Sequence, residues 1–284
     1  MVERQTNLPL YPKVLWNRPV SRAQSGRLLI VGGRRGAIAV LQSVFQTAVA
    51  AGIGQIKILA PDVLKPLLSG VAEASFGPST NSGSLARLGL DLLTELASDA
   101  DAALLGADLS NSSETAILAE RFIASYHQGL ILVADAIPMI AQSPDVVRQR
   151  PRTLLVFTMQ ELFKLAGKLG LPIHIRPEAG LAAKVEIASD FWELSRIDLA
   201  LIGPEIIIRS GSKTSITPLP PKTRLEPTAA AGVLSVFYTQ NPSASFEGLT
   251  TGAFVLAQSV GEQAQTTDQL AAAIIKVVNE ADQN

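Results

Sequence analysis

Short apolar runs alternate with longer stretches of helical periodicity along most of the chain. Runs typical of buried strands lie at 26–33, 55–62, 101–106, 130–135, 152–158 and 197–203. Stretches with helical spacing follow them at 36–52, 85–96, 113–128, 159–170 and 177–195. Because parallel strands are buried on both faces and are joined by helical crossovers, this alternation predicts an α/β fold with a mostly parallel central sheet.

The last third of the chain follows a different pattern. Residues 205–217 form two apolar runs around a Ser-Gly-Ser turn, which predicts a hairpin, and 218–227 is a proline-rich loop. Helical spacing resumes at Thr228 and returns at 243–262 and 267–282. We therefore expect a single three-layer α/β/α domain over residues 26–284, preceded by an N-terminal arm over residues 1–25.

Composition excludes several functional classes. Apolar residues make up 47% of the 284 residues and charged residues 17%, and the net charge of −1 argues against general nucleic-acid binding. Without a bilayer-length apolar run or a signal-peptide pattern, we expect a cytoplasmic protein away from the membrane. There is no cysteine, and His127 and His174 are far apart, so no structural or catalytic zinc site is expected.

Basic residues are concentrated at the start of the chain. Up to residue 36 the only acid is Glu3, whereas the basic residues are Arg4, Lys13, Arg18, Arg22, Arg27, Arg34 and Arg35. This asymmetry fits either a solvated arm or a positive rim beside an anionic ligand.

Gly32, Gly33 and Gly36 form a turn between the first expected strand and its helix. Such a turn can hold a phosphate at the helix N-terminus, or it can simply be tight. With Asp62 after the second strand, the same glycines also fit a Rossmann-type dinucleotide-binding protein.

The stretch 222–242 has a similar double interpretation. Small residues at 229–232 open an apolar helix, where bare backbone amides could accept a phosphate. The alternative is close packing of an alanine-rich helix.

Several segments together resemble the ribokinase-like superfamily, and most closely the ADP- or ATP-dependent NAD(P)H-hydrate dehydratases. They are GRLLIVGGRRGAIAV at 26–40, DAALLGADLS at 101–110, LVADAIPMI at 132–140 and LLVFTMQELFKLAG at 154–167. The resemblance covers residues from about 18 to 265. It implies a ribokinase-like fold, a homo-oligomer, and an ADP or ATP cleft with Mg²⁺ as a companion ion. The residues matched to that cleft are Gly32, Gly33, Gly36, Asp135, Thr158, Glu161, Gly203, Ala230, Ala231 and Gly232.

Three positions depart from the family pattern. The family has Gly-(Ser/Thr)-Gly-Asp at a helix N-terminus, and the alignment places Gly232 where the catalytic Asp stands. Ile202 and Gly203 replace a Lys-Gly pair, and Asp108 replaces a glycine. The resemblance therefore implies a nucleotide-binding pseudoenzyme with lost or reduced dehydratase activity.

Other functions stay open from the sequence. Glu226 or Glu205 could substitute for the missing acid, which would give an active dehydratase or a small-molecule kinase. Besides the dinucleotide binder, a purely structural oligomer subunit is the remaining alternative. An Asp introduced at Gly232 would be expected to restore part of the activity if that position faces the cleft.

Overall fold

The computed structural model describes residues 1–16, 19, 21–110, 112–140, 144–148, 150–169, 171–172, 178–261 and 265–281. Within these residues, ten strands form one sheet in the order β1-β10-β9-β8-β7-β6-β5-β2-β3-β4. All neighbouring strands are parallel except at β9, which runs antiparallel to β8 and β10. The strands are β1 (Val2–Arg4), β2 (Arg27–Gly32), β3 (Gln55–Pro61), β4 (Ala74–Gly77), β5 (Ala102–Ala107), β6 (Gly129–Val133), β7 (Thr153–Phe157), β8 (Asp198–Ile202), β9 (Glu205–Ser210) and β10 (Lys213–Pro218).

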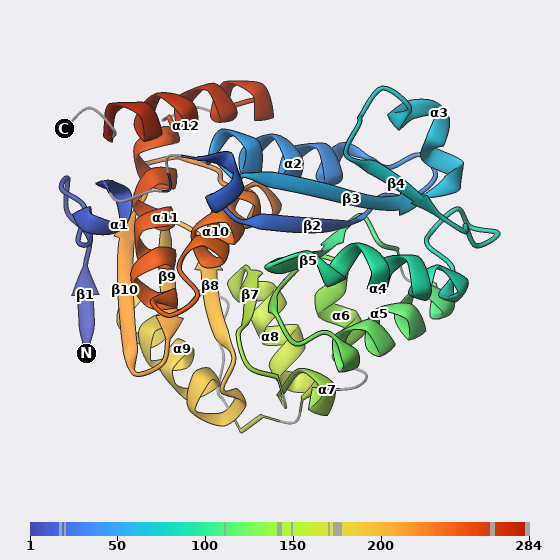
Figure 1. The fold of residues 1–284 in the computed structure, drawn as a ribbon. Coiled ribbons are helices and arrows are strands. Elements are labelled where there is room, and N and C mark those ends of the chain that lie inside the picture. The colour runs from blue at the N-terminus through green and yellow to red at the C-terminus, as the bar shows by residue number, and fades with distance from the viewer. Residues whose placement is uncertain are drawn as a thin grey trace.

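Helices cover both faces of this sheet (Figure 1). One face is covered by α1 (Pro12–Trp16), α2 (Ala39–Ala50), α10 (Pro227–Gln240), α11 (Ser245–Ser259) and α12 (Thr267–Ala281). The other is covered by α4 (Leu90–Ser98), α5 (Ser113–Ser125), α6 (Ala136–Ile140), α7 (Pro144–Arg148), α8 (Met159–Lys168) and α9 (Leu181–Ser195), and α3 (Lys65–Leu68) follows β3. The expected three-layer α/β/α architecture is confirmed.

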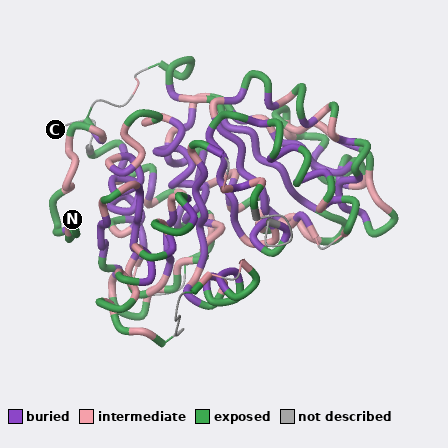
Figure 2. The backbone as a smooth tube through the Cα atoms, turned by 90° about the horizontal axis from the view of Figure 1, so that it is seen from below, coloured by how far each residue is buried: buried purple, intermediate pink, exposed green. Residues whose placement is uncertain are grey.

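Alternate residues of the central strands belong to two separate cores. In β2, Leu28 and Ile30 face the α2 and α10 side, whereas Leu29 and Val31 face the α4 and α5 side. Since a strand points successive side chains to opposite faces, continuous apolar runs are needed where both faces are covered. Figure 2 shows these strands as buried along most of their length.

The residues before β2 are partly built into the domain. β1 pairs with β10 as an edge strand, and Leu15 of α1 is buried in the core. The expected arm over residues 1–25 therefore adds a strand to the sheet. A three-residue strand with one half-buried side chain carries no periodicity that could have predicted it.

The expected strands and the hairpin are present, but the first long helix starts later than its pattern. Residues 33–38 form a turn in which Gly33 and Gly36 have positive φ angles of 85° and 74°, and α2 begins at Ala39. Glycine tolerates this backbone conformation because it has no Cβ.

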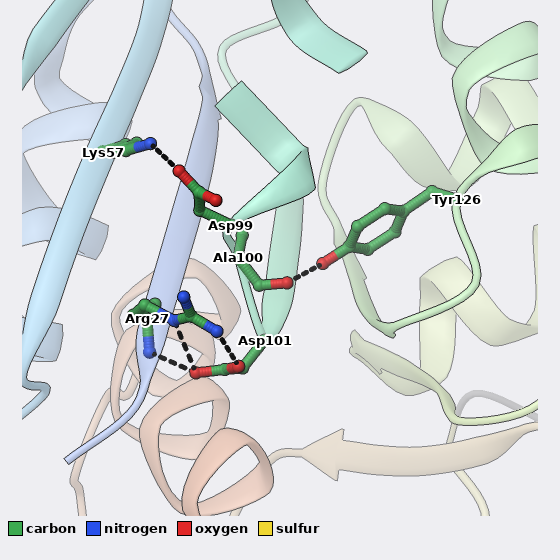
Figure 3. Close-up of polar contacts among 6 residues, drawn as sticks. All are labelled: Arg27, Lys57, Asp99, Ala100, Asp101 and Tyr126. Atoms are coloured by element: carbon green, nitrogen blue, oxygen red, sulfur yellow. Dashed lines mark hydrogen bonds and ion pairs between the residues drawn. The ribbon is translucent and has the colours of Figure 1, made fainter. Parts of the chain in front are cut away.

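The amino ends of the strands are joined by polar contacts (Figure 3). Arg27 donates hydrogen bonds from its backbone and its guanidinium to Asp101, with lengths of 2.9 to 3.3 Å. Lys57 forms an ion pair with Asp99 at 3.3 Å, and the Tyr126 hydroxyl donates to the Ala100 carbonyl at 3.1 Å. These contacts connect β2, β3 and the start of β5, and Arg27, Lys57 and Asp99 also line a cavity of about 250 Å³ at this edge.

Asp198 is a charged group at the same edge, where β8 begins. Burial raises the pKa of its carboxyl group to about 6, although hydrogen bonds from Ser210 and from the Gly211 amide oppose the shift. Arg152 is also near, and its guanidinium lies over the Tyr238 ring at 5.1 Å and donates to the Tyr238 carbonyl. Because the folded pKa lies above the unfolded value, folding favours the protonated acid.

We expect Asp198→Asn to change the pH dependence of stability. The stabilising preference for protonated Asp198 is fully present below pH 4 and is lost as the pH rises through about 6. The free energy of unfolding of the wild type, relative to that of the variant, should therefore fall by about 2 kcal/mol between pH 4 and pH 7. Urea denaturation of both proteins across this range measures it, and parallel curves would contradict the assignment.

Candidate functional site

Polar residues and glycines gather where the parallel strands end. Asp108 follows β5, Asp135 follows β6 and Thr158 follows β7, while Gly32 ends β2 and Gly203 follows β8. These strands are neighbours or near neighbours in the sheet, so their ends lie along one edge. In open α/β sheets, ligands bind outside this carboxyl edge.

A cavity of about 220 Å³ lies between the first turns of α2, α10 and α12. Its lining also includes Arg224 and Glu226 from the loop before α10, and Val260 after α11. The volume suits a phosphate group or a single ring, since pockets for drug-sized ligands measure roughly 300–1,000 Å³. Three helix N-termini direct the positive ends of their dipoles toward this cavity, which favours an anion.

Two of the three helix starts are capped by side chains of the protein. The Asp108 carboxylate accepts a hydrogen bond from the Val40 amide in the first turn of α2, at 3.2 Å. At α12, the Gln269 side chain accepts from the Thr266 amide and the Thr266 hydroxyl accepts from the Gln269 amide. The capping residue of α10, Glu226, makes no such side-chain bond among the described residues. Of these three helix starts, that of α10 is the one without a side-chain cap among the described residues, which leaves its first amides available to a ligand.

Asp108 and Asp135 lie close enough to interact electrostatically. Burial raises the pKa of the Asp108 carboxyl group, and the negative charge of Asp135 adds to the shift. The Val40 amide and the Arg34 guanidinium act in the opposite direction. The Asp135 carboxylate accepts a hydrogen bond from the Ser110 amide at 3.1 Å. Asp108 thus lies against the first turn of α2, with the Asp135 carboxylate near it.

The backbone around this pair is unusual. Asp108, Ser110 and Ala134 have positive φ angles of 66°, 73° and 48°, a conformation that is rare for residues with a side chain. Such residues are frequent at functional sites, where the surrounding structure holds them in place. No pattern in the sequence signals these angles. Asp108 was noticeable only as a departure from the family glycine.

The expected phosphate turn has a packing role at two of its three glycines. A Cβ on Gly32 would lie 2.1 Å from the Ala107 carbonyl oxygen, and one on Gly33 would lie 2.6 Å from a Leu64 methyl. Gly33 also donates its amide to that Ala107 carbonyl. Gly36 is exposed and has open space around it. Gly32 allows β2 and β5 to approach each other, Gly33 leaves room for the Leu64 side chain, and of the three glycines only Gly36 is open to a ligand.

Thr158 and Glu161 form a capping box at the start of α8. The Thr158 hydroxyl accepts from the Glu161 amide, and the Glu161 carboxylate accepts from the Thr158 amide at 2.8 Å. Both side chains are thereby used in stabilising the helix. Gly203 is half-buried in the turn between β8 and β9, where its amide donates to the Glu205 carbonyl.

Gly232 does not lie at the helix terminus where the family's Asp would stand. α10 begins at Pro227, and its first intrahelical hydrogen bond runs from the Ala230 amide to the Glu226 carbonyl. Ala230, Ala231 and Gly232 are fully buried one turn further on, so their amides are used inside the helix. The amides that precede this bond belong to Thr228 and Ala229. The expectation of free amides at 230–232 was wrong, because in a helix that begins at Pro227 the amides from Ala230 onward bond to carbonyls four residues earlier.

The space beside Gly232 is occupied by α2. A Cβ at this position would lie 2.0 Å from the Thr47 hydroxyl oxygen and 2.7 Å from the Val44 carbonyl oxygen. An Asp there would point into a helix contact, so the expected recovery of activity from Gly232→Asp does not follow.

The two substitute acids are placed very differently. Glu226 is exposed and lines the cavity, together with Arg224. Glu205 forms an ion pair with Lys184 of α9 at 2.6 Å, and both side chains are mostly buried. Because α9 and α10 cover opposite faces of the sheet, the ion pair of Glu205 with Lys184 lies on the side away from the cavity.

Three further expectations concern other parts of the chain. Asp62, the acid of the dinucleotide alternative, accepts a hydrogen bond from the Ser79 hydroxyl after β3. In the described part of the chain, no group of three or more His, Cys, Asp or Glu could hold a metal ion, and His174 lies outside it. None of the described helices is long and apolar enough to span a membrane.

Comparison with solved structures identifies the fold. A ribokinase-like superfamily protein from Enterococcus faecalis aligns with a TM-score of 0.75 and 16% identity, covering 100% of this chain and 97% of that chain. A hypothetical protein from Streptococcus mutans aligns with a TM-score of 0.76 and 19% identity, covering 99% and 100%. No family model and no curated protein matches the sequence.

A third similar structure has a described activity. It is the ADP/ATP-dependent NAD(P)H-hydrate dehydratase from Bacillus subtilis, co-crystallised with ATP/Mg²⁺. The TM-score is 0.68 at 12% identity, with 98% of this chain and 100% of that chain covered. The chain therefore has the ribokinase-like fold that its sequence motifs predicted.

We expect substitutions at Gly232 to destabilise the fold. Gly232→Ala should lower the free energy of unfolding by about 1–3 kcal/mol, the usual result of overpacking. Gly232→Asp should lower it further, because the added carboxylate would be buried without a partner. Gly167→Ala in α8 is the matched control, since its helix position is open. That change should stabilise by roughly 0.5–1 kcal/mol. Urea denaturation compares the three variants, and a Gly232→Asp protein as stable as the wild type would contradict the packing.

Proposed function

We propose that the protein binds ADP or ATP at the carboxyl edge of the sheet, with the start of α10 as the anion site, and that it has lost or greatly reduced dehydratase activity. The observation that carries this proposal is the uncapped start of α10, which opens on the cavity while the starts of α2 and α12 are capped by Asp108 and by Thr266 with Gln269. Backbone amides at such a place favour phosphate.

Two further features support a nucleotide. The Bacillus subtilis protein of the same fold was co-crystallised with ATP/Mg²⁺. Arg224 brings a positive charge to the cavity, whose volume of about 220 Å³ accepts one part of a nucleotide, and the remainder would lie on the open rim. Mg²⁺ typically binds through one or two carboxylates plus substrate phosphates, and Asp108 and Asp135 offer two at the same edge.

The proposed loss of catalysis rests on the residues of the first two turns of α10. From Pro227 to Gly232 there is no acid, and Gly232 is packed against α2. A positioned general base contributes roughly 10²- to 10⁴-fold in rate, so a cleft without one binds its nucleotide but converts substrate slowly. The other proposed properties, a cytoplasmic location and a homo-oligomer, follow the resemblance and the composition.

Nucleotide binding is tested by a charge placed at the cavity. Thr228→Asp adds a carboxylate to the first turn of α10, where the helix dipole stabilises it by about 0.3–1 kcal/mol, so the fold should be retained. Beside a phosphate the same charge is repulsive, and we expect the affinity for ADP and ATP to fall at least ~10-fold. Isothermal titration with and without Mg²⁺ measures the affinity.

The matched control for this experiment is Ser243→Asp, which adds the same charge at an exposed position before α11, near the amino edge where Gln240 of α10 bonds the Ser25 and Gly52 carbonyls. It should leave nucleotide affinity unchanged. If neither nucleotide binds the wild type or raises its melting temperature, the nucleotide proposal fails.

A second candidate function is an active enzyme with a different acid. Glu226 favours it because this carboxylate lines the cavity, and Asp108 favours it because burial and Asp135 raise its pKa toward the range useful for proton transfer. Either acid would have to remove the proton that the family's Asp removes.

Absorbance at the reduced-nicotinamide wavelength separates the two candidates. With hydrated NADPH and ADP or ATP, we expect little or no dehydration by the wild type. Robust turnover would instead support the active enzyme, and then either Glu226→Gln or Asp108→Asn should lower the rate ~10²- to 10⁴-fold. Glu205→Gln is the control, since Glu205 is paired with Lys184 away from the cavity.

A further inference from the structure

An apolar groove of about 590 Å³ lies between the N-terminal segment, α11 and the second half of α12. Leu15 and Phe254 are buried at its base, and Val277 is half-buried along its side. Leu8 and Trp16 project at its border with 75% and 54% of their surface exposed. A tryptophan this exposed beside an apolar recess is typical of a protein interface, where aromatic residues are enriched.

The arrangement fits a second copy of the same chain. A two-fold symmetric interface requires that one surface carry both the projecting group and the recess that receives it. The groove meets this requirement, because Trp16 and Leu8 project directly beside the recess that they could enter on another copy.

The charged residues on the groove side of α12 can also pair with the same residues of a second copy. Lys276 and Glu280 line the same groove and form an exposed i,i+4 ion pair at 3.8 Å. When two such helices meet in opposite directions, each copy's Lys276 can lie beside the other copy's Glu280. A partner of different sequence would need a matching pair of its own, whereas a second copy supplies it automatically.

We propose that the protein forms a two-fold symmetric dimer through this groove, with Trp16 as the central anchor. The inference specifies the surface behind the proposed homo-oligomer and depends on neither nucleotide binding nor catalysis. α12 connects the two regions, because its first turn lines the cavity at α10 and its second half lines the groove.

Sedimentation equilibrium of the full chain tests the dimer. The wild type should sediment at twice the 30.0 kDa chain mass at tens of micromolar. Trp16→Ser should raise the dimer dissociation constant at least ~10-fold, as expected for an interface anchor. Phe163→Ser is the matched control, since Phe163 is an aromatic residue of α8 with similar exposure, 51%, on the opposite face of the sheet. This control should leave the dissociation constant unchanged.

Charge reversal gives a second, independent measurement. Lys276→Glu should weaken the dimer by placing like charges across the interface, and adding Glu280→Lys to it should restore the affinity. Circular dichroism checks that each variant is folded. A wild type that stays monomeric at 100 µM would overturn the proposal, and so would a dimer that survives Trp16→Ser. A chain that does not self-associate and instead binds a different protein through this groove would also overturn the proposal.

Discussion

The close contact between α10 and α2 determines the geometry of the rest of the molecule. Gly232 has no side chain, and this allows Val44 and Thr47 of α2 to approach the α10 backbone within the space that a Cβ would need. A helix pair can approach this closely only where one residue at the crossing is very small. Since both helices start at the carboxyl edge, the same contact brings their two N-termini together at one cavity.

α10 is also held at its other end. The Gln240 side chain donates to the carbonyl oxygens of Ser25 and Gly52, and Arg152 donates to the Tyr238 carbonyl. All residues from Ala229 to Thr239 are buried, because this helix packs on the sheet, on α2 and on α11. A helix that is apolar on all sides and fixed at its C-terminus presents a rigid N-terminus, which is what a backbone anion site requires.

Two neighbouring sites of opposite charge lie along the carboxyl edge of the sheet. The start of α10 and Arg224 provide positive potential, whereas Asp108 and Asp135 provide two carboxylates at the ends of β5 and β6. Asp108 joins these places, because its carboxylate caps the first turn of α2, which lines the cavity. This separation of charge suits a phosphorylated ligand with a cation nearby. At the opposite edge, Arg27 and Asp101 form an ion pair at 2.9 Å.

The sequence by itself determined the layers of the fold, because two-sided burial requires continuous apolar strands and one-sided burial requires helical periodicity. The sequence also shows directly that no acidic residue lies between Pro227 and Gly232. Only the tertiary structure decided where those residues point. Gly232 packs against α2, and Glu205 is paired with Lys184. Glu226 lines the cavity, and Asp108 caps the turn of α2 that lines it. These assignments depend on contacts between residues far apart in the chain, such as Asp108 with Val40. Such contacts cannot be predicted from local periodicity, because the periodicity reports only on neighbouring residues.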